Sequence, residues 1–76
     1  MELNEFIKRF CEELEIDNAE ELNGDTDFRQ LDEWSSLAGL TIMGLCDDEY
    51  GVTLNATEMR GAETLQDLFD LVNSKK

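Results

Sequence analysis

The stretch Asp32-Glu33-Trp34-Ser35-Ser36-Leu37 marks the point where a turn ends and a helix with periodic apolar residues begins. Ser35 is the expected N-cap, because its side-chain oxygen can accept a hydrogen bond from a backbone N–H in the first helical turn. Ser36 is then the first helical residue, and its own hydroxyl stays free. A phosphate on that hydroxyl would lie at the positive end of the helix dipole, near unpaired N–H groups. The stretch therefore predicts where a central helix starts and which serine can accept an anionic group.

The central helix is predicted over residues 36–50, and its residues separate into two faces when they are placed at 100° per residue. The face expected to meet the core carries Gly39, Ile42, Met43, Cys46 and Tyr50. The opposite face carries Leu37, Leu40, Thr41, Gly44 and Asp48, with Asp47 beside them. Single exposed leucines are common on protein surfaces. An apolar pair rimmed by acid beside a free serine nevertheless favours a docking surface.

The chain before this helix divides into one helix and one long loop. Apolar residues recur at steps of three and four and predict a first amphipathic helix: Leu3, Phe6, Ile7, Phe10, Cys11 and Leu14. From residue 15 to residue 34 the periodicity lapses. A long loop is expected there, with one helical turn around residues 19–22. Four apolar residues should pin it to the core: Ile16, Leu22, Phe28 and Leu31.

A calcium loop and other metal sites are not expected. Asn23, Asp25 and Asp27 alternate as calcium ligands do, but the sixth position of such a loop holds Phe28 instead of glycine. The twelfth position holds Trp34 instead of glutamate. The chain has two cysteines and no histidine, which is too few for a structural zinc site.

The chain after the central helix predicts an extended connector and two more helices. Asn55, with Glu58 three residues on, suits the start of a short helix over residues 56–60 that ends at Gly61. Thr64 is the expected cap of a last helix. Its apolar stripe consists of Leu65, Leu68, Phe69 and Val72. The sequence thus predicts an all-α fold in one domain over residues 1–76. We expect a small four-helix bundle of three longer helices and one short helix, with a long loop between the first two.

The composition limits the classes of partner. Six Lys and Arg residues against nineteen Asp and Glu residues give a formal net charge of −13. Such a surface repels nucleic acid and anionic membranes and attracts proteins with basic patches. No apolar run is long enough to span a bilayer, and the acidic N-terminal residues do not resemble a signal peptide, so we expect a cytoplasmic monomer. Cys11 and Cys46 are expected to be buried free thiols in a reducing compartment, with a disulfide as the alternative.

Three stretches resemble the acyl carrier proteins, a family of small acidic four-helix domains. Ser35-Ser36-Leu37 is similar to the family motif Asp-Ser-Leu at the start of the second helix, with Ser35 in place of the aspartate. Residues 47–52, Asp-Asp-Glu-Tyr-Gly-Val, resemble the end of that helix. Thr64-Leu65 and the stripe after it resemble the last helix. The resemblance covers essentially the whole chain, including the long first loop. It implies that Ser36 receives a 4′-phosphopantetheine arm from coenzyme A.

The resemblance also implies how such a carrier would work. The thiol of the arm would hold an acyl or aminoacyl group as a thioester and present it to enzymes of fatty-acid, lipid, polyketide or related specialised biosynthesis. The expected partners are a phosphopantetheinyl transferase and acyl-transferring or acyl-activating enzymes with basic docking patches. The candidate docking residues are Leu37, Leu40, Asp47 and Asp48. The candidate lining residues of an acyl pocket are Ile42, Met43, Cys46, Ala62 and Leu68.

Catalysis by the chain itself is not expected. A nucleophilic serine needs a base with an orienting partner, and the chain has no histidine. Ser36 is therefore better interpreted as a substrate for modification. Many fatty-acid carriers have acids where this chain has Ala38 and Thr41, so a specialised pathway and housekeeping lipid synthesis both stay open. A small acidic interaction module, for example an inhibitor of a basic protein, is the alternative of a different class.

Overall fold

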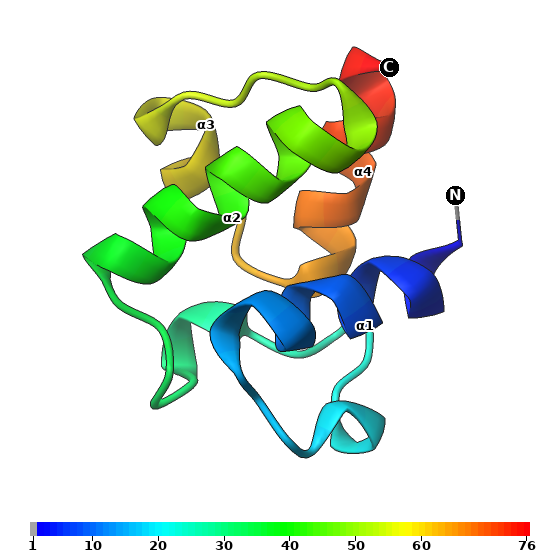
Figure 1. Ribbon diagram of the computed structural model, residues 1–76, viewed down its shortest axis with the longest axis vertical. Helices are drawn as coiled ribbons and strands as arrows, with labels where there is room; N and C mark the ends of the chain where they lie inside the picture. Colours follow the sequence, from blue (N-terminus) through cyan, green and yellow to red (C-terminus); the bar gives the residue numbers. More distant parts are fainter. Residues whose placement is uncertain (1) are drawn as a thin grey trace.

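The computed structural model describes residues 2–76, which form a bundle of four α-helices without strands (Figure 1). The helices are α1 (Leu3–Leu14), α2 (Ser36–Tyr50), α3 (Ala56–Gly61) and α4 (Leu65–Lys75). Two short 3-10 turns, η1 (Ala19–Glu21) and η2 (Phe28–Gln30), lie in the loop between α1 and α2. The predicted all-α bundle of three longer helices and one short helix is confirmed. The predicted domain spans residues 1–76, of which Met1 lies outside the described residues.

Helix α1 packs its apolar stripe against α2 and α4. Phe6, Ile7, Phe10 and Cys11 are all buried, as their spacing predicts. The helix ends at Glu15, whose φ of 57° places it in the left-handed region. Its backbone N–H there caps the last turn. None of the helices within residues 2–76 has the length and the apolar run that crossing a bilayer requires.

The long loop between α1 and α2 is anchored by apolar side chains and by the start of α4. Ile16 and Phe28 are buried, and the expected helical turn near residue 19 is η1. The backbone N–H of Gln66 donates to the Gly24 carbonyl at 2.9 Å. The side-chain oxygen of Asn23 accepts from the Asp25 backbone N–H at 2.8 Å, so this residue shapes a turn. The loop therefore has a defined path across the bundle.

Trp34 anchors the C-terminal end of this loop. Its ring stacks on Phe10 with a centroid distance of 6.0 Å and an interplanar angle of 9°. It also packs against Phe28 in an edge-to-face arrangement, with a centroid distance of 4.7 Å and an interplanar angle of 70°. Aromatic pairs at such distances add stability beyond the burial of their area. Because Trp34 directly precedes Ser35, this cluster places the start of α2 over the end of α1.

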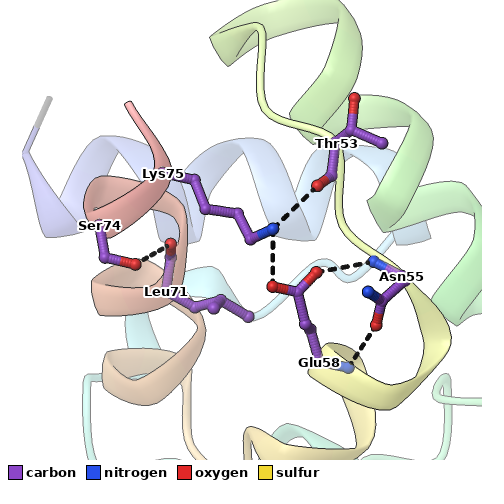
Figure 2. A network of polar contacts seen from close by, with 6 residues as sticks. All are labelled: Thr53, Asn55, Glu58, Leu71, Ser74 and Lys75. Atoms are coloured by element: carbon purple, nitrogen blue, oxygen red, sulfur yellow. Dashed lines mark hydrogen bonds and ion pairs between the residues drawn. The ribbon is translucent and has the colours of Figure 1, made fainter.

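A polar network joins α4 to the start of α3 (Figure 2). Asn55 and Glu58 form the predicted reciprocal cap of α3. The Nζ atom of Lys75 lies 2.6 Å from the Glu58 carboxylate and also donates to the Thr53 carbonyl at 3.4 Å. The hydrogen bond from Lys75 is the main reason that the pKa of Glu58 lies below its ordinary value. The network fixes one end of the short α3 relative to the bundle.

The buried face of α2 differs from the predicted stripe. Its buried residues are Ala38, Ile42, Leu45 and Cys46. Of these, the predicted stripe includes Ile42 and Cys46, and it misses Ala38 and Leu45. The other predicted members, Gly39, Met43 and Tyr50, are half-buried. The six-residue α3 covers little of the side that carries Gly39 and Met43. That side therefore remains partly open.

Two glycines, Gly44 within α2 and Gly51 at its C-cap, should respond in opposite ways to alanine. Gly44 lies in the helix interior, and a Cβ there would meet no atom within 4 Å. Gly44→Ala should raise the free energy of unfolding by about 0.5–1 kcal/mol, because glycine loses more backbone entropy on folding. Gly51 ends the helix with a φ of 66°, a left-handed conformation that disfavours a side chain. Gly51→Ala should therefore lower the free energy of unfolding by about 1–2 kcal/mol. Thermal melts monitored by circular dichroism check both. A shift of both variants in the same direction would contradict these backbone assignments.

Candidate functional site

Ser36 is the first residue of α2, and Ser35 is its N-cap, as predicted. Ser35 has extended backbone angles, and its side-chain oxygen accepts a hydrogen bond from the Ala38 N–H at 3.2 Å. Its carbonyl accepts the first backbone bond of the helix, from Gly39 at 3.0 Å. The cap therefore does not involve the Ser36 hydroxyl. Ser36 is exposed, so an incoming enzyme can reach it.

A pocket of about 420 Å³ lies beside Ser36, between η2, the first half of α2 and α3. Figure 1 shows α3 beside this half of α2. This volume is within the range of about 300–1,000 Å³ that is usual for small-molecule sites. The lining residues are Arg29, Trp34, Ser35, Ser36, Gly39, Leu40, Met43, Ala56, Met59 and Arg60. The pocket thus combines an apolar wall, two guanidinium groups and the hydroxyl of Ser36.

The candidate docking residues lie along the exposed side of α2. Leu37 and Leu40 are 72% and 63% exposed, and within residues 2–76 they are the large apolar side chains that stay exposed. Asp47 and Asp48 are exposed farther along the same helix. A spacing of three residues between Leu37 and Leu40, and of seven between Leu40 and Asp47, places these residues on the same side. The structure therefore presents an apolar pair next to Ser36 and acid toward the other end of α2.

The five candidate lining residues of an acyl pocket lie in different environments. Ile42, Cys46 and Leu68 are fully buried in the core. Ala62 is buried and borders a second, acidic hollow lined by Glu58, Gly61, Asp67, Asp70, Leu71 and Ser74. Met43 alone among the five lines the pocket beside Ser36. The structure therefore does not bring these five side chains together around one hollow.

Several residues of the pocket beside Ser36 are not among the sequence-predicted site residues. The sequence could have indicated Arg29 and Arg60 as site residues, because basic residues are scarce in so acidic a chain. The sequence could also have indicated Trp34, since this residue directly precedes the two serines. Met59 gave no signal, because only the packing of α3 beside α2 brings it to the pocket.

The two cysteines are buried and free, as predicted. Burial raises the pKa of the Cys46 thiol to about 11. Burial, followed by the charge of Glu33, also raises the pKa of Cys11. Both thiols are therefore protonated near neutral pH and are poor nucleophiles.

Comparison with known proteins finds a family model that matches most of the chain. The family model described as "Phosphopantetheine attachment site" matches residues 4–72. This range covers all of α2 and α3 and most of α1 and α4. No curated protein and no solved structure matches the chain.

The two adjacent serines should differ in their effect on stability. Ser35→Ala removes the oxygen that caps α2 and should lower the free energy of unfolding by about 1 kcal/mol. Ser36→Ala removes an exposed hydroxyl outside the cap and should change it by less than about 0.5 kcal/mol. Urea unfolding of the unmodified proteins measures both. Equal losses from the two substitutions would mean that Ser35 does not act as the cap.

Proposed function

We propose, because this chain belongs to the phosphopantetheine attachment site family, that it is an acyl carrier whose Ser36 holds the 4′-phosphopantetheine arm. Domains of this family bear the arm covalently and are carriers, not catalysts. The observation that supports Ser36 most is its place at the first position of α2, exposed and outside the cap that Ser35 forms. The pocket beside it can receive part of a flexible group.

The attachment reaction requires only an accessible hydroxyl from this chain. The Ser36 oxygen forms a bond to the phosphorus on the pantetheine side of the coenzyme A diphosphate. The P–O bond to adenosine bisphosphate breaks, and the hydroxyl proton passes to a base of the transferase. The N-terminus of α2 stabilises the resulting phosphodiester, because its free N–H groups carry partial positive charge. When bound, the arm supplies a thiol that holds an acyl or aminoacyl group as a thioester.

Carriers of this family interact with a phosphopantetheinyl transferase and with acyl-handling enzymes. For this chain we propose that Leu37 and Leu40 supply the apolar contact and that Asp47 and Asp48 attract a basic patch on the partner. Their exposure beside and beyond Ser36 supports this assignment. The formal charge of −13 extends the attraction over the whole domain. The pathway served is a fatty-acid, lipid, polyketide or related specialised biosynthesis.

The assignment of Ser36 can be tested directly by mass. Incubation with coenzyme A and a phosphopantetheinyl transferase should add one arm to the wild-type chain. Ser36→Ala should remain unmodified because it lacks the accepting oxygen, whereas Ser35→Ala should still accept one arm. Intact mass spectrometry with fragment mapping measures the number and position of arms. Attachment to Ser35 would contradict the proposed site, and attachment to neither serine would favour an acidic interaction module.

The acidic end of α2 should accelerate association with the transferase. Asp47→Asn with Asp48→Asn should lower kcat/KM for arm transfer about two- to tenfold at low salt, because steering by nearby charges raises on-rates. Rising salt should shrink the difference, since charges are screened over about 8 Å at physiological ionic strength. Glu12→Gln with Glu13→Gln on α1 is the control, because it removes the same charge elsewhere. Equal effects of the two pairs would assign the attraction to net charge alone.

A further inference from the structure

The loop between α1 and α2 contains a turn with the dipeptide Asn23-Gly24. Of the five asparagines in the chain, Asn23 is the one that a glycine follows. An asparagine side-chain amide can be attacked by the backbone nitrogen of the next residue. Glycine favours this attack, because it has no Cβ to crowd the approach. The pair therefore has the chemical groups for a reaction within the chain itself.

Hydrogen bonds fold the Asn23 side chain back over the Gly24 nitrogen. The Oδ1 atom of Asn23 accepts from the Asp25 backbone N–H at 2.8 Å, which closes an Asx turn around that nitrogen. The backbone of Asn23 is held as well. Its N–H donates to Thr26 Oγ1 at 3.0 Å, and its carbonyl accepts from the Thr26 N–H at 3.1 Å. The turn thus keeps the amide carbon, Cγ, beside the nitrogen that can attack it.

Both reacting groups are in a suitable state. Within residues 2–76 the Gly24 N–H donates to no protein acceptor, so no bond has to break before this nitrogen reacts. Asn23 is exposed and Gly24 is half-buried, so water reaches the pair. The Asp25 N–H polarises the Asn23 carbonyl and stabilises the negative charge that develops on Oδ1 during attack, as a donor of an oxyanion hole does.

We propose that Asn23 is a site of spontaneous covalent modification, by deamidation, in the folded chain. Hydroxide or water removes the Gly24 amide proton, and the Gly24 nitrogen forms a bond to Asn23 Cγ. The bond between Cγ and Nδ2 breaks, and this nitrogen leaves as ammonia after it takes a proton from water. The resulting cyclic imide adds water at either of its carbonyls and yields aspartate or isoaspartate. Water is the only co-reactant, and the reaction does not depend on an arm at Ser36.

The two products affect the junction between this loop and α4 differently. The carbonyls of Gly24 and Thr26 accept the N–H groups of Gln66 and Leu65 at 2.9 and 3.0 Å, in the first turn of α4. Isoaspartate lengthens the backbone by one methylene directly before Gly24. Space there is limited, since a Cβ on Gly24 would lie 3.0 Å from Gln66 Oε1 and 3.2 Å from Leu3 Cδ2. Isoaspartate therefore disturbs the junction, whereas aspartate keeps the original backbone length.

The other four asparagines lack this arrangement and serve as internal controls. Each is followed by a residue that has a Cβ. Asn4 and Asn73 lie within α1 and α4, and Asn55 caps α3. The side-chain amide of Asn18 donates to Glu21 Oε2 at 2.7 Å, so its nitrogen is held by a carboxylate.

The test uses the full chain without an arm, incubated at neutral and at mildly alkaline pH. Peptide mapping by mass spectrometry follows all five asparagines, and an isoaspartyl carboxyl methyltransferase with labelled S-adenosylmethionine detects isoaspartate. The same chain in guanidinium chloride gives the rate in the unfolded state. Asn23→Ser is the matched control, because it removes the reactive amide but keeps a side-chain oxygen that can accept from the Asp25 N–H.

In the folded wild type, Asn23 should be converted before the other four asparagines and at a rate comparable to that in the unfolded chain. The rate should rise with pH, because the Gly24 nitrogen must lose its proton. Asn23→Ser should give no isoaspartate. The purified isoaspartyl form should melt about 4–8 °C below the wild type, the shift expected when a small domain loses the net contribution of about one hydrogen bond. Asn23→Asp should melt close to the wild type.

Conversion of Asn23 in the unfolded chain alone would overturn the proposal, because the turn would then protect the amide. Conversion of another asparagine first, in the folded chain, would overturn it as well. Equal melting temperatures of the isoaspartyl form and Asn23→Asp would overturn the proposed effect on the junction with α4. None of these outcomes bears on Ser36, because the chain tested carries no arm.

Discussion

The packing of Trp34 against Phe10 and Phe28 is the contact on which the rest of the site depends. The loop before α2 has few regular hydrogen bonds of its own, so apolar side chains must define where it ends. Trp34 ties that end to α1, and the cap at Ser35 begins one residue later. The position of Ser36 therefore follows from hydrophobic packing on one side and a backbone cap on the other.

The shortness of α3 gives α2 three different environments. One side is buried in the core through Ile42 and Cys46. A second side, with Gly39 and Met43, faces α3, which is too short to cover it and leaves a pocket. The third side carries the exposed Leu37 and Leu40. A single helix can thus hold the domain together, border the site and meet a partner, with Leu40 lying where the pocket meets the exposed side.

Because the net charge of the chain is strongly negative, its few basic residues have a large effect on the local electrostatic potential. Most of the surface repels anions, so the local environment of Arg29 and Arg60 stands out more than it would on a neutral protein. Lys75 contributes differently, because its bonds to Glu58 and Thr53 position the start of α3 (Figure 2). Three of the six basic residues thus line the pocket or position the start of α3.

The sequence by itself determined the helices, the cap at Ser35 and the exposure of Leu37 and Leu40, because local spacing and capping chemistry act over a few residues. Only the tertiary structure decided which side of α2 is most buried. Leu45 and Ala38 face the core because the flanking helices cover that side. A helical wheel of α2 does not contain the positions of those neighbouring helices. Local sequence patterns also could not predict the pocket, since Arg29 and Arg60 lie on different elements. Their proximity follows from the position of η2 beside α3, where the Arg29 side chain donates to the Arg60 carbonyl 31 residues farther along the chain. No short-range rule encodes such a contact.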